Sequence, residues 1–298
     1  MCRPRRLKKL PPKLNDMTIR QAISKAVCAM EAAGVPDSRI DAELLLSHVT
    51  GLDRLRMLLA GANELTPEQE QRFSSLLLSR AGRKPLQYLL GTQIFYGLTF
   101  QVDSRVLIPR QETEELCELG IAHLKKLGSA PRALDLCTGS GAIAVALSHE
   151  CPFVEVCASD LSTDALSLAK ENAASNGVAV QFYQGDLFAP LEGQRFDLIL
   201  SNPPYIPTQE CDTLQAEVMQ EPRMALDGGT DGFDFYRRIA REAAEHLTPR
   251  GMIAVEAGDG EADGIAALFR ESGLHSVSVH MDLYGMPRMV SAYAKEQA

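Results

Sequence analysis

The chain has 298 residues, of which 45% are hydrophobic and 23% are charged, a composition typical of a globular protein of about two domains. No apolar run approaches the ~18–20 residues of a membrane-spanning helix, so the sequence argues against an integral membrane protein. The formal net charge is −9, and because residues 1–16 carry +5, the remaining chain carries −14. An acidic body argues against broad contact with nucleic-acid phosphates.

Cysteine and histidine patterns indicate the compartment and the absence of a metal site. The seven cysteines include no Cys-x-x-Cys pair, and the six histidines include no His-Glu-x-x-His pattern. We therefore expect reduced thiols, a cytoplasmic protein and no bound metal. The basic segment 1–16 lacks the apolar core of a secretory signal and is expected to be a disordered arm.

Residues 17–91 have the periodicity of helices. Apolar side chains recur at helical spacing over 19–30, with Thr18 placed to cap the start and Gly34 to end the helix. A second helix is expected over 37–50, and Thr66-Pro67 begins another. Because no strand-like alternation appears before Gln93, we expect a domain of four or five helices over 17–91.

The residue pattern changes at residue 92. From there, β-forming residues interrupted by Gly97 predict a hairpin linker over 92–110. Strands and helices then alternate through a domain over 111–298. Strands are expected at 133–137, 154–160, 180–184, 196–201, 252–256, 277–282 and 288–293, and helices at 142–150, 163–176, 233–246 and 261–272. This order predicts a doubly wound, mainly parallel sheet. The last two strands are joined by only 283–287, so we expect them to be antiparallel.

A glycine-rich loop, Cys137-Thr138-Gly139-Ser140-Gly141, follows the first strand of this sheet, and Asp160 ends the second strand. Such a loop lets a ligand approach the backbone closely, and the acid can accept both hydroxyls of a ribose. The same pattern is typical of dinucleotide folds, and a tight turn with a helix cap at Asp160 is the structural alternative.

The charge around this loop favours one kind of cofactor. A pyrophosphate is usually met by a helix N-terminus and a nearby cation, but residues 134–149 contain no Lys or Arg. A cofactor without phosphate, such as S-adenosylmethionine, suits the loop better. Asp186 and Leu187 follow the third strand, where an adenine ring would lie.

The turn Asn202-Pro203-Pro204-Tyr205 follows the fourth strand. Two prolines fix two φ angles and remove two donors, so this corner is rigid and presents an amide, bare carbonyls and an aromatic ring. The Asn202 side-chain oxygen and the Pro203 carbonyl could accept both hydrogens of a planar NH₂ group, with Tyr205 packed against it. Positioning would then supply most of the rate of methyl transfer to such a nitrogen, without a strong general base.

With these motifs the chain resembles the HemK/PrmC family, the N5-glutamine methyltransferases that modify peptide chain release factors. The resemblance extends from about Met17 to Tyr293. It is carried by the glycine loop, by the 202–205 turn, and by 41–46, Leu107-Ile108-Pro109-Arg110, 112–114 and 221–226. The 202–205 turn also occurs in adenine-N6 and guanine-N2 methyltransferases, so the segment 107–110 and the helical domain are what indicate a protein glutamine as substrate.

The resemblance implies a fold and an activity. The fold is a seven-stranded, Rossmann-like class I S-adenosylmethionine-dependent methyltransferase domain, joined by a β-hairpin to a small N-terminal helical bundle. The activity is methylation of the glutamine in the Gly-Gly-Gln motif of release factors, which modulates translation termination, with the helical domain helping to dock the substrate. No membrane or direct nucleic-acid partner is expected. The sequence does not define the oligomeric state, and a monomer is the expectation.

The resemblance also implies site residues. Those implied to contact the cofactor are Cys137, Thr138, Gly139, Ser140, Gly141, Asp160, Asp186, Leu187 and Asn202. Those implied to hold the substrate amide are Asn202, Pro203, Pro204 and Tyr205.

Three positions depart from the family pattern. Cys137 replaces a glycine, and because a Cβ at positive φ costs roughly 1–2 kcal/mol, we expect ordinary extended backbone there. Gln111 replaces a proline, a modest change, and Leu187 replaces a frequent aromatic, so adenine stacking is expected to be weaker.

Several alternatives stay open at this point. A ribosomal-protein glutamine methyltransferase uses the same chemistry. A DNA or RNA amino-methyltransferase acting on adenine N6 is opposed by the −14 body. A non-catalytic binding protein is opposed by the intact motifs, and a nicotinamide dehydrogenase by the proline corner and the lack of phosphate-binding cations.

Overall fold

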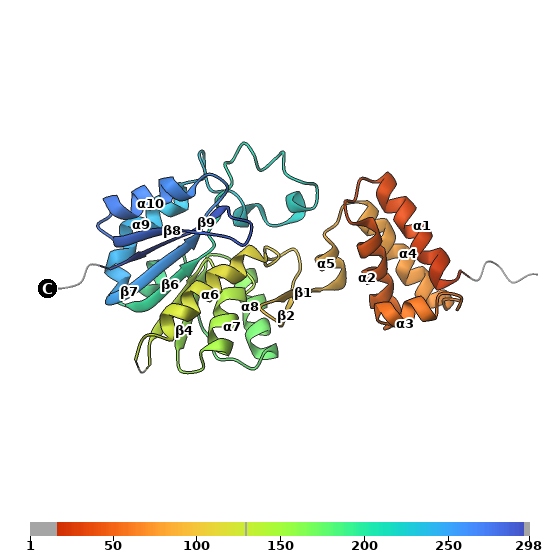
Figure 1. The fold of residues 1–298 in the computed structure, drawn as a ribbon, viewed down its shortest axis with the longest axis horizontal. Coiled ribbons are helices and arrows are strands. Elements are labelled where there is room, and N and C mark those ends of the chain that lie inside the picture. The colour runs from red at the N-terminus through yellow and green to blue at the C-terminus, as the bar shows by residue number, and fades with distance from the viewer. Residues whose placement is uncertain (1–16, 129, 295–298) are drawn as a thin grey trace, which may run out of the picture. The chain divides into compact units, whose positions relative to one another are not determined.

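The structure is a computed structural model that describes residues 17–128 and 130–294, and it divides into two compact units between Leu90 and Gly91 (Figure 1). The predicted N-terminal arm, residues 1–16, lies outside the described residues. Within the described ranges, no helix combines the length and the apolar character that a membrane crossing requires.

The described part of the first unit is the expected helical bundle. Its helices are α1 (Ile19–Ala32), α2 (Ser38–Thr50), α3 (Arg54–Leu59), α4 (Pro67–Ala81) and α5 (Leu86–Leu90). Thr18 and Thr66 cap α1 and α4, each within a complete capping box, because both hydroxyls accept a backbone N–H of the first turn. Phe73 is buried in the apolar core, and Arg80 donates to Asp41 at 2.7 Å in a buried ion pair.

The second unit contains a two-stranded hairpin and a seven-stranded sheet with its helices. The strands are β1 (Thr92–Phe95), β2 (Leu98–Gln101), β3 (Arg132–Leu136), β4 (Glu155–Asp160), β5 (Gln181–Gln184), β6 (Phe196–Ser201), β7 (Leu247–Glu256), β8 (His275–Met281) and β9 (Pro287–Tyr293). The helices are α6 (Glu112–Leu124), α7 (Ala142–Glu150), α8 (Thr163–Ser175), α9 (Asp234–His246) and α10 (Ala262–Glu271), with short 3-10 turns at Ala189–Leu191, Val218–Gln220 and Arg223–Ala225.

The strand order of the sheet is β5-β4-β3-β6-β7-β9-β8, with β5 to β7 parallel and β9 antiparallel to both of its neighbours. The predicted doubly wound sheet and its antiparallel end are therefore confirmed. Helices α6, α7 and α8 cover one face of the sheet, and α9 and α10 cover the other (Figure 1).

Helix α6 is absent from the predicted elements. It follows the β1–β2 hairpin in the chain and packs against β6, so closely that a Cβ on Gly120 would lie 2.8 Å from the Leu200 side chain. A signal was present in the sequence, because buried Leu116, Ile121 and Leu124 follow an acidic first turn.

The hairpin turns through Tyr96 and Gly97, which both have positive φ, as a type I′ turn requires. Phe95 and Phe100 lie on its two strands, with ring centroids 5.9 Å apart, and both are buried in the core of the second unit. The hairpin is therefore part of the packed second unit, whereas the sequence predicted a linker.

Candidate functional site

The strand order brings the two sequence motifs together. β3 lies at the centre of the parallel strands, and the chain progresses from it toward β5 on one side and, after returning to β6, toward β7 on the other. Such a switch point leaves a crevice at the carboxyl ends of the strands. Leu136 pairs with Ser201 across β3 and β6, and the Ser201 hydroxyl donates to the Leu136 carbonyl at 2.6 Å. The glycine loop and the 202–205 turn therefore begin side by side.

A cavity of about 350 Å³ lies at this edge, within the size range of small-molecule sites. Nine of the residues implied by the resemblance line it: Cys137, Thr138, Gly139, Ser140, Asp160, Asp186, Leu187, Asn202 and Pro204. Gly141, Pro203 and Tyr205 are not among its lining residues. Gly141 instead faces α8, where a Cβ would lie 3.1 Å from Ala169. The Asp186 carboxylate forms an ion pair with Arg238 at 2.7 Å.

The expected extended backbone at Cys137 is wrong, because its φ is 63°. Gly139 and Gly141 also have positive φ, so the backbone of the loop winds in a left-handed sense at three alternate residues. The Thr138 N–H donates to the Ser159 carbonyl at 3.0 Å and closes the loop against β4. The strand pairing therefore imposes the turn, and the Cys137 side chain, which packs against the apolar core, tolerates it.

Asp135 lies beneath the loop on β3 and is fully buried. Its Oδ2 accepts the Thr138 hydroxyl and the Ala144 N–H, the latter at 3.0 Å. Its Oδ1 has no hydrogen-bond partner among the described residues. Burial raises the pKa of this carboxyl to about 7.

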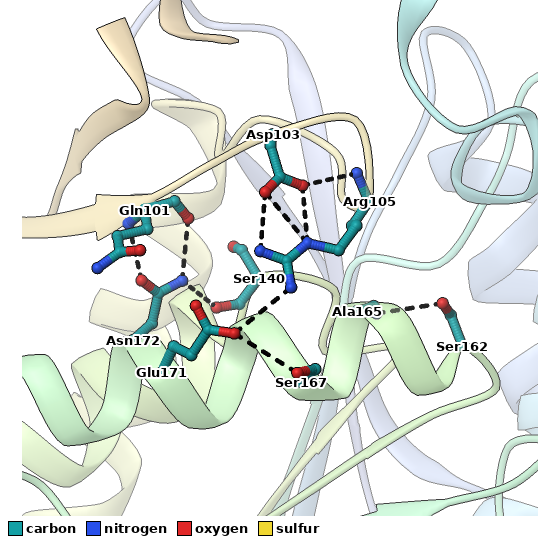
Figure 2. Close-up of polar contacts among 9 residues, drawn as sticks. All are labelled: Gln101, Asp103, Arg105, Ser140, Ser162, Ala165, Ser167, Glu171 and Asn172. Carbon is teal, nitrogen blue, oxygen red and sulfur yellow. Dashed lines mark hydrogen bonds and ion pairs between the residues drawn. The ribbon is translucent and has the colours of Figure 1, made fainter.

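Asp160 connects the glycine loop to the start of α8. Its carboxylate accepts the Gly139 N–H and the Ser162 N–H, both at 2.8 Å. The cap of α8 is Ser162 rather than Asp160, because the Ser162 hydroxyl accepts the Ala165 N–H at 3.2 Å (Figure 2). Burial raises the pKa of Asp160, and the backbone donors oppose that rise. A carboxylate has about four acceptor positions, so it can accept further donors from a ligand.

Asn172 of α8 positions the wall of the cavity and was not singled out by the sequence. Figure 2 shows its side chain between β2 and the glycine loop. Its Oδ1 accepts the Gln101 N–H at 2.7 Å, and its Nδ2 donates to the carbonyls of Gln101 at 3.1 Å and Ser140 at 2.9 Å. The amide is fully buried, so these contacts couple the loop rigidly to the hairpin.

Two arginines line the cavity from the segment between β2 and α6, and both are paired with carboxylates. Arg105 donates to Asp103 at 2.8 Å and to Glu171 at 3.4 Å (Figure 2). Arg110 forms an ion pair with Glu221, which also accepts the Ile108 N–H at 2.9 Å. Neither guanidinium is therefore a free partner for a phosphate.

The 202–205 turn is held from both sides. The Ile206 N–H donates to the Leu226 carbonyl at 2.9 Å, and the Gly228 N–H donates to the Ile206 carbonyl at 2.8 Å. Asn202 lines the cavity, and its Nδ2 donates to the Thr113 hydroxyl at 3.1 Å. Its Oδ1 is buried and accepts no hydrogen bond from any described residue. Because an unpaired buried acceptor is costly, this amide oxygen indicates a missing donor.

Comparison with known proteins agrees with this geometry. Residues 21–91 match the model of the PrmC N-terminal domain, and residues 112–233 match that of the methyltransferase small domain. A release factor glutamine methyltransferase from Geobacter sulfurreducens is 43% identical over 92% of this chain and 95% of its own length. Another, from Deinococcus radiodurans, is 43% identical over 93% of this chain and 98% of its own. A solved methyltransferase from Pyrococcus furiosus has a similar fold, with a TM-score of 0.51 and 20% identity over 76% of this chain and 99% of that one.

Proposed function

Because the chain belongs to the release factor glutamine methyltransferase family, we propose that it methylates the side-chain amide nitrogen, N5, of the glutamine in the Gly-Gly-Gln motif of peptide chain release factors. The observation that carries this proposal is the Asn202 Oδ1, which has no hydrogen-bond partner among residues 17–128 and 130–294 and lines the same cavity as the glycine loop and Asp160. A buried hydrogen-bond acceptor at that place suits a methyl-accepting substrate that brings an N–H donor of its own.

The residues of the cavity suit S-adenosylmethionine as the methyl donor. Both lining arginines are paired, so the described lining of the cavity offers no free cation for a phosphate. Asp160 retains acceptor positions for ribose hydroxyls. Thr138, Gly139 and Ser140 would face the methionine and ribose portions, while Leu187 would border the adenine with the Asp186–Arg238 pair beside it. When bound, this cofactor supplies an electrophilic methyl group on a sulfonium.

The 202–205 turn would hold the acceptor amide. A glutamine NH₂ has two hydrogens, and Asn202 Oδ1 and the Pro203 carbonyl would accept one each, with the Tyr205 ring against the flat group. Pro203 and Tyr205 lie outside the residues that line the cavity, so their contribution would come from the backbone carbonyl and from packing at its edge. The chemical role of the turn is to orient a weak nucleophile.

The substrate and its compartment follow from the same proposal. Release factors act during translation, so the enzyme would work in the cytoplasm, where reduced cysteines such as buried Cys117 and Cys157 persist. The helical unit, residues 17–90, would contribute to docking the release factor.

The test is transfer of a labelled methyl group from S-adenosylmethionine to a purified release factor. We expect label on the wild-type factor and none on a factor whose loop glutamine is replaced by alanine. Asn202→Ala should lower the rate of transfer by about 10²–10³-fold while calorimetry shows that the cofactor still binds. Equal labelling of the two factors would move the acceptor to another residue, and full turnover by Asn202→Ala would remove the amide-holding role.

A further inference from the structure

Three elements of the second unit converge behind Asn202. Thr113 lies in the first turn of α6, Asn202 directly follows β6, and Glu256 ends β7. The Thr113 hydroxyl donates to Glu256 Oε2 at 2.5 Å, and the Asn202 Nδ2 donates to the Thr113 Oγ1 at 3.1 Å. Thr113 and Glu256 are each only 4% exposed, so water does not compete for these two bonds.

The carboxylate of Glu256 determines the direction of both hydrogen bonds that link it through Thr113 to Asn202. A carboxylate only accepts, so Glu256 takes the single hydrogen of the Thr113 hydroxyl. That hydroxyl then has only lone pairs left for Asn202, and Asn202 must present its NH₂ group rather than its oxygen. The amide oxygen consequently faces away from Thr113, and no residue that the structure describes donates to it.

We propose that Thr113 and Glu256 are positioning residues which hold the Asn202 amide in the one orientation that leaves its oxygen free to accept the substrate N–H. A turned Asn202 amide would present donors to a substrate that also presents donors, and the acceptor nitrogen would not bind in line. This inference rests on the proposed function, because it explains how the amide-holding residue is itself oriented.

The surroundings of Glu256 determine the pH at which its carboxyl is charged and only accepts hydrogen bonds. Burial raises the pKa of its carboxyl to about 7, whereas Arg110 and Arg288 oppose that rise by stabilising the charge. The nearby carboxylate of Glu112 repels the charge of Glu256 and raises its pKa further. At a pH of about 8.5, the charged, purely accepting form predominates, so the assay is made there.

The experiment compares Thr113→Val, which keeps the shape but removes the hydroxyl, with Thr113→Ser, which keeps it. We expect Thr113→Val to lower kcat for methyl transfer to the release factor by about 10- to 100-fold with unchanged cofactor affinity. Thr113→Ser should stay within about threefold of wild type. The thermal midpoint of each variant identifies any loss of folding.

A double-mutant cycle separates positioning from a general structural effect. In the Asn202→Ala background, single-turnover transfer should change by less than about threefold when Thr113→Val is added, because the group being oriented is gone. Full kcat in Thr113→Val, or an equal further loss in the double variant, would overturn the proposal. Wild-type transfer to the loop glutamine is measured first, so a failure of the proposed function shows itself separately, before any variant is compared.

Discussion

Gly228 offers a way to displace the 202–205 turn without altering any residue in it. A Cβ built on Gly228 would lie 2.6 Å from the Tyr205 Cα and 2.7 Å from both the Tyr205 carbonyl carbon and the Gly232 oxygen. Ordinary contacts of a Cβ begin at 3.4 Å, so Gly228→Ala requires a backbone movement of about 0.8 Å. The obstructing atoms belong to the main chain. Two backbone hydrogen bonds, between Ile206 and residues Leu226 and Gly228, join the end of the 202–205 turn to the segment that carries Gly228, so the two segments cannot separate freely.

A displacement of about 1 Å at a reacting group can cost about 10²-fold in rate. We therefore expect Gly228→Ala to lower kcat by about 100-fold in the release-factor methylation assay. Cofactor affinity by calorimetry should stay within about twofold, because the glycine loop and Asp160 are held by other contacts. Gly128→Ala is the matched control, since that glycine is exposed with no described atom within 4 Å of the added Cβ. A folded Gly228→Ala enzyme with wild-type kcat would refute this account of the turn.

Two further predictions concern the glycine loop. Cys137→Gly removes the strain of a side chain at a φ of 63°, which stabilises the fold by roughly 1–2 kcal/mol. The glycine also makes the unfolded chain more flexible and loses the packing of the thiol, and both effects destabilise the fold. The free energy of unfolding should therefore stay within about 1 kcal/mol of wild type. Cys137→Val should lose about 2 kcal/mol or more in urea unfolding, because a β-branched residue resists positive φ; equal stability of the two variants would contradict the strain. The second prediction is a pH dependence, because the pKa of Asp135 is about 7 in the folded state, above its unfolded value, and the folded protein therefore binds an extra proton between the two. The stability that protonated Asp135 contributes is fully present below the pKa of this carboxyl in the unfolded chain. It is lost as the pH rises through the folded pKa of about 7, by up to about 1.4 kcal/mol per pH unit. The wild type should thus lose stability relative to Asp135→Asn between about pH 4 and pH 7 and level off above that, in denaturant titrations of the cofactor-free protein. Parallel curves over this range would show that the buried carboxyl does not titrate there.

Local sequence was sufficient for most elements of the second unit. The strand at 196–201 and the helix at 142–150 have the predicted bounds, because runs of apolar residues between glycine and proline signals define them. The short connection between β8 and β9 was enough to predict their antiparallel pairing, since no crossover helix fits into it. The glycine loop and the 202–205 turn were recognisable because their residue types constrain the backbone directly.

Tertiary structure decided what those motifs contact. Thr113, Asn202 and Glu256 lie far apart in the chain and meet only because β6 and β7 are adjacent and α6 packs across them. Asn172 couples the hairpin to the glycine loop for the same kind of reason. The conformation of Cys137 was likewise decided by strand pairing, because the hydrogen bonds that close the loop on β4 outweigh the local preference of a side chain for negative φ. Periodicity and turn chemistry are local properties of a chain, whereas the partners of a buried polar group depend on which distant segments the fold packs around it.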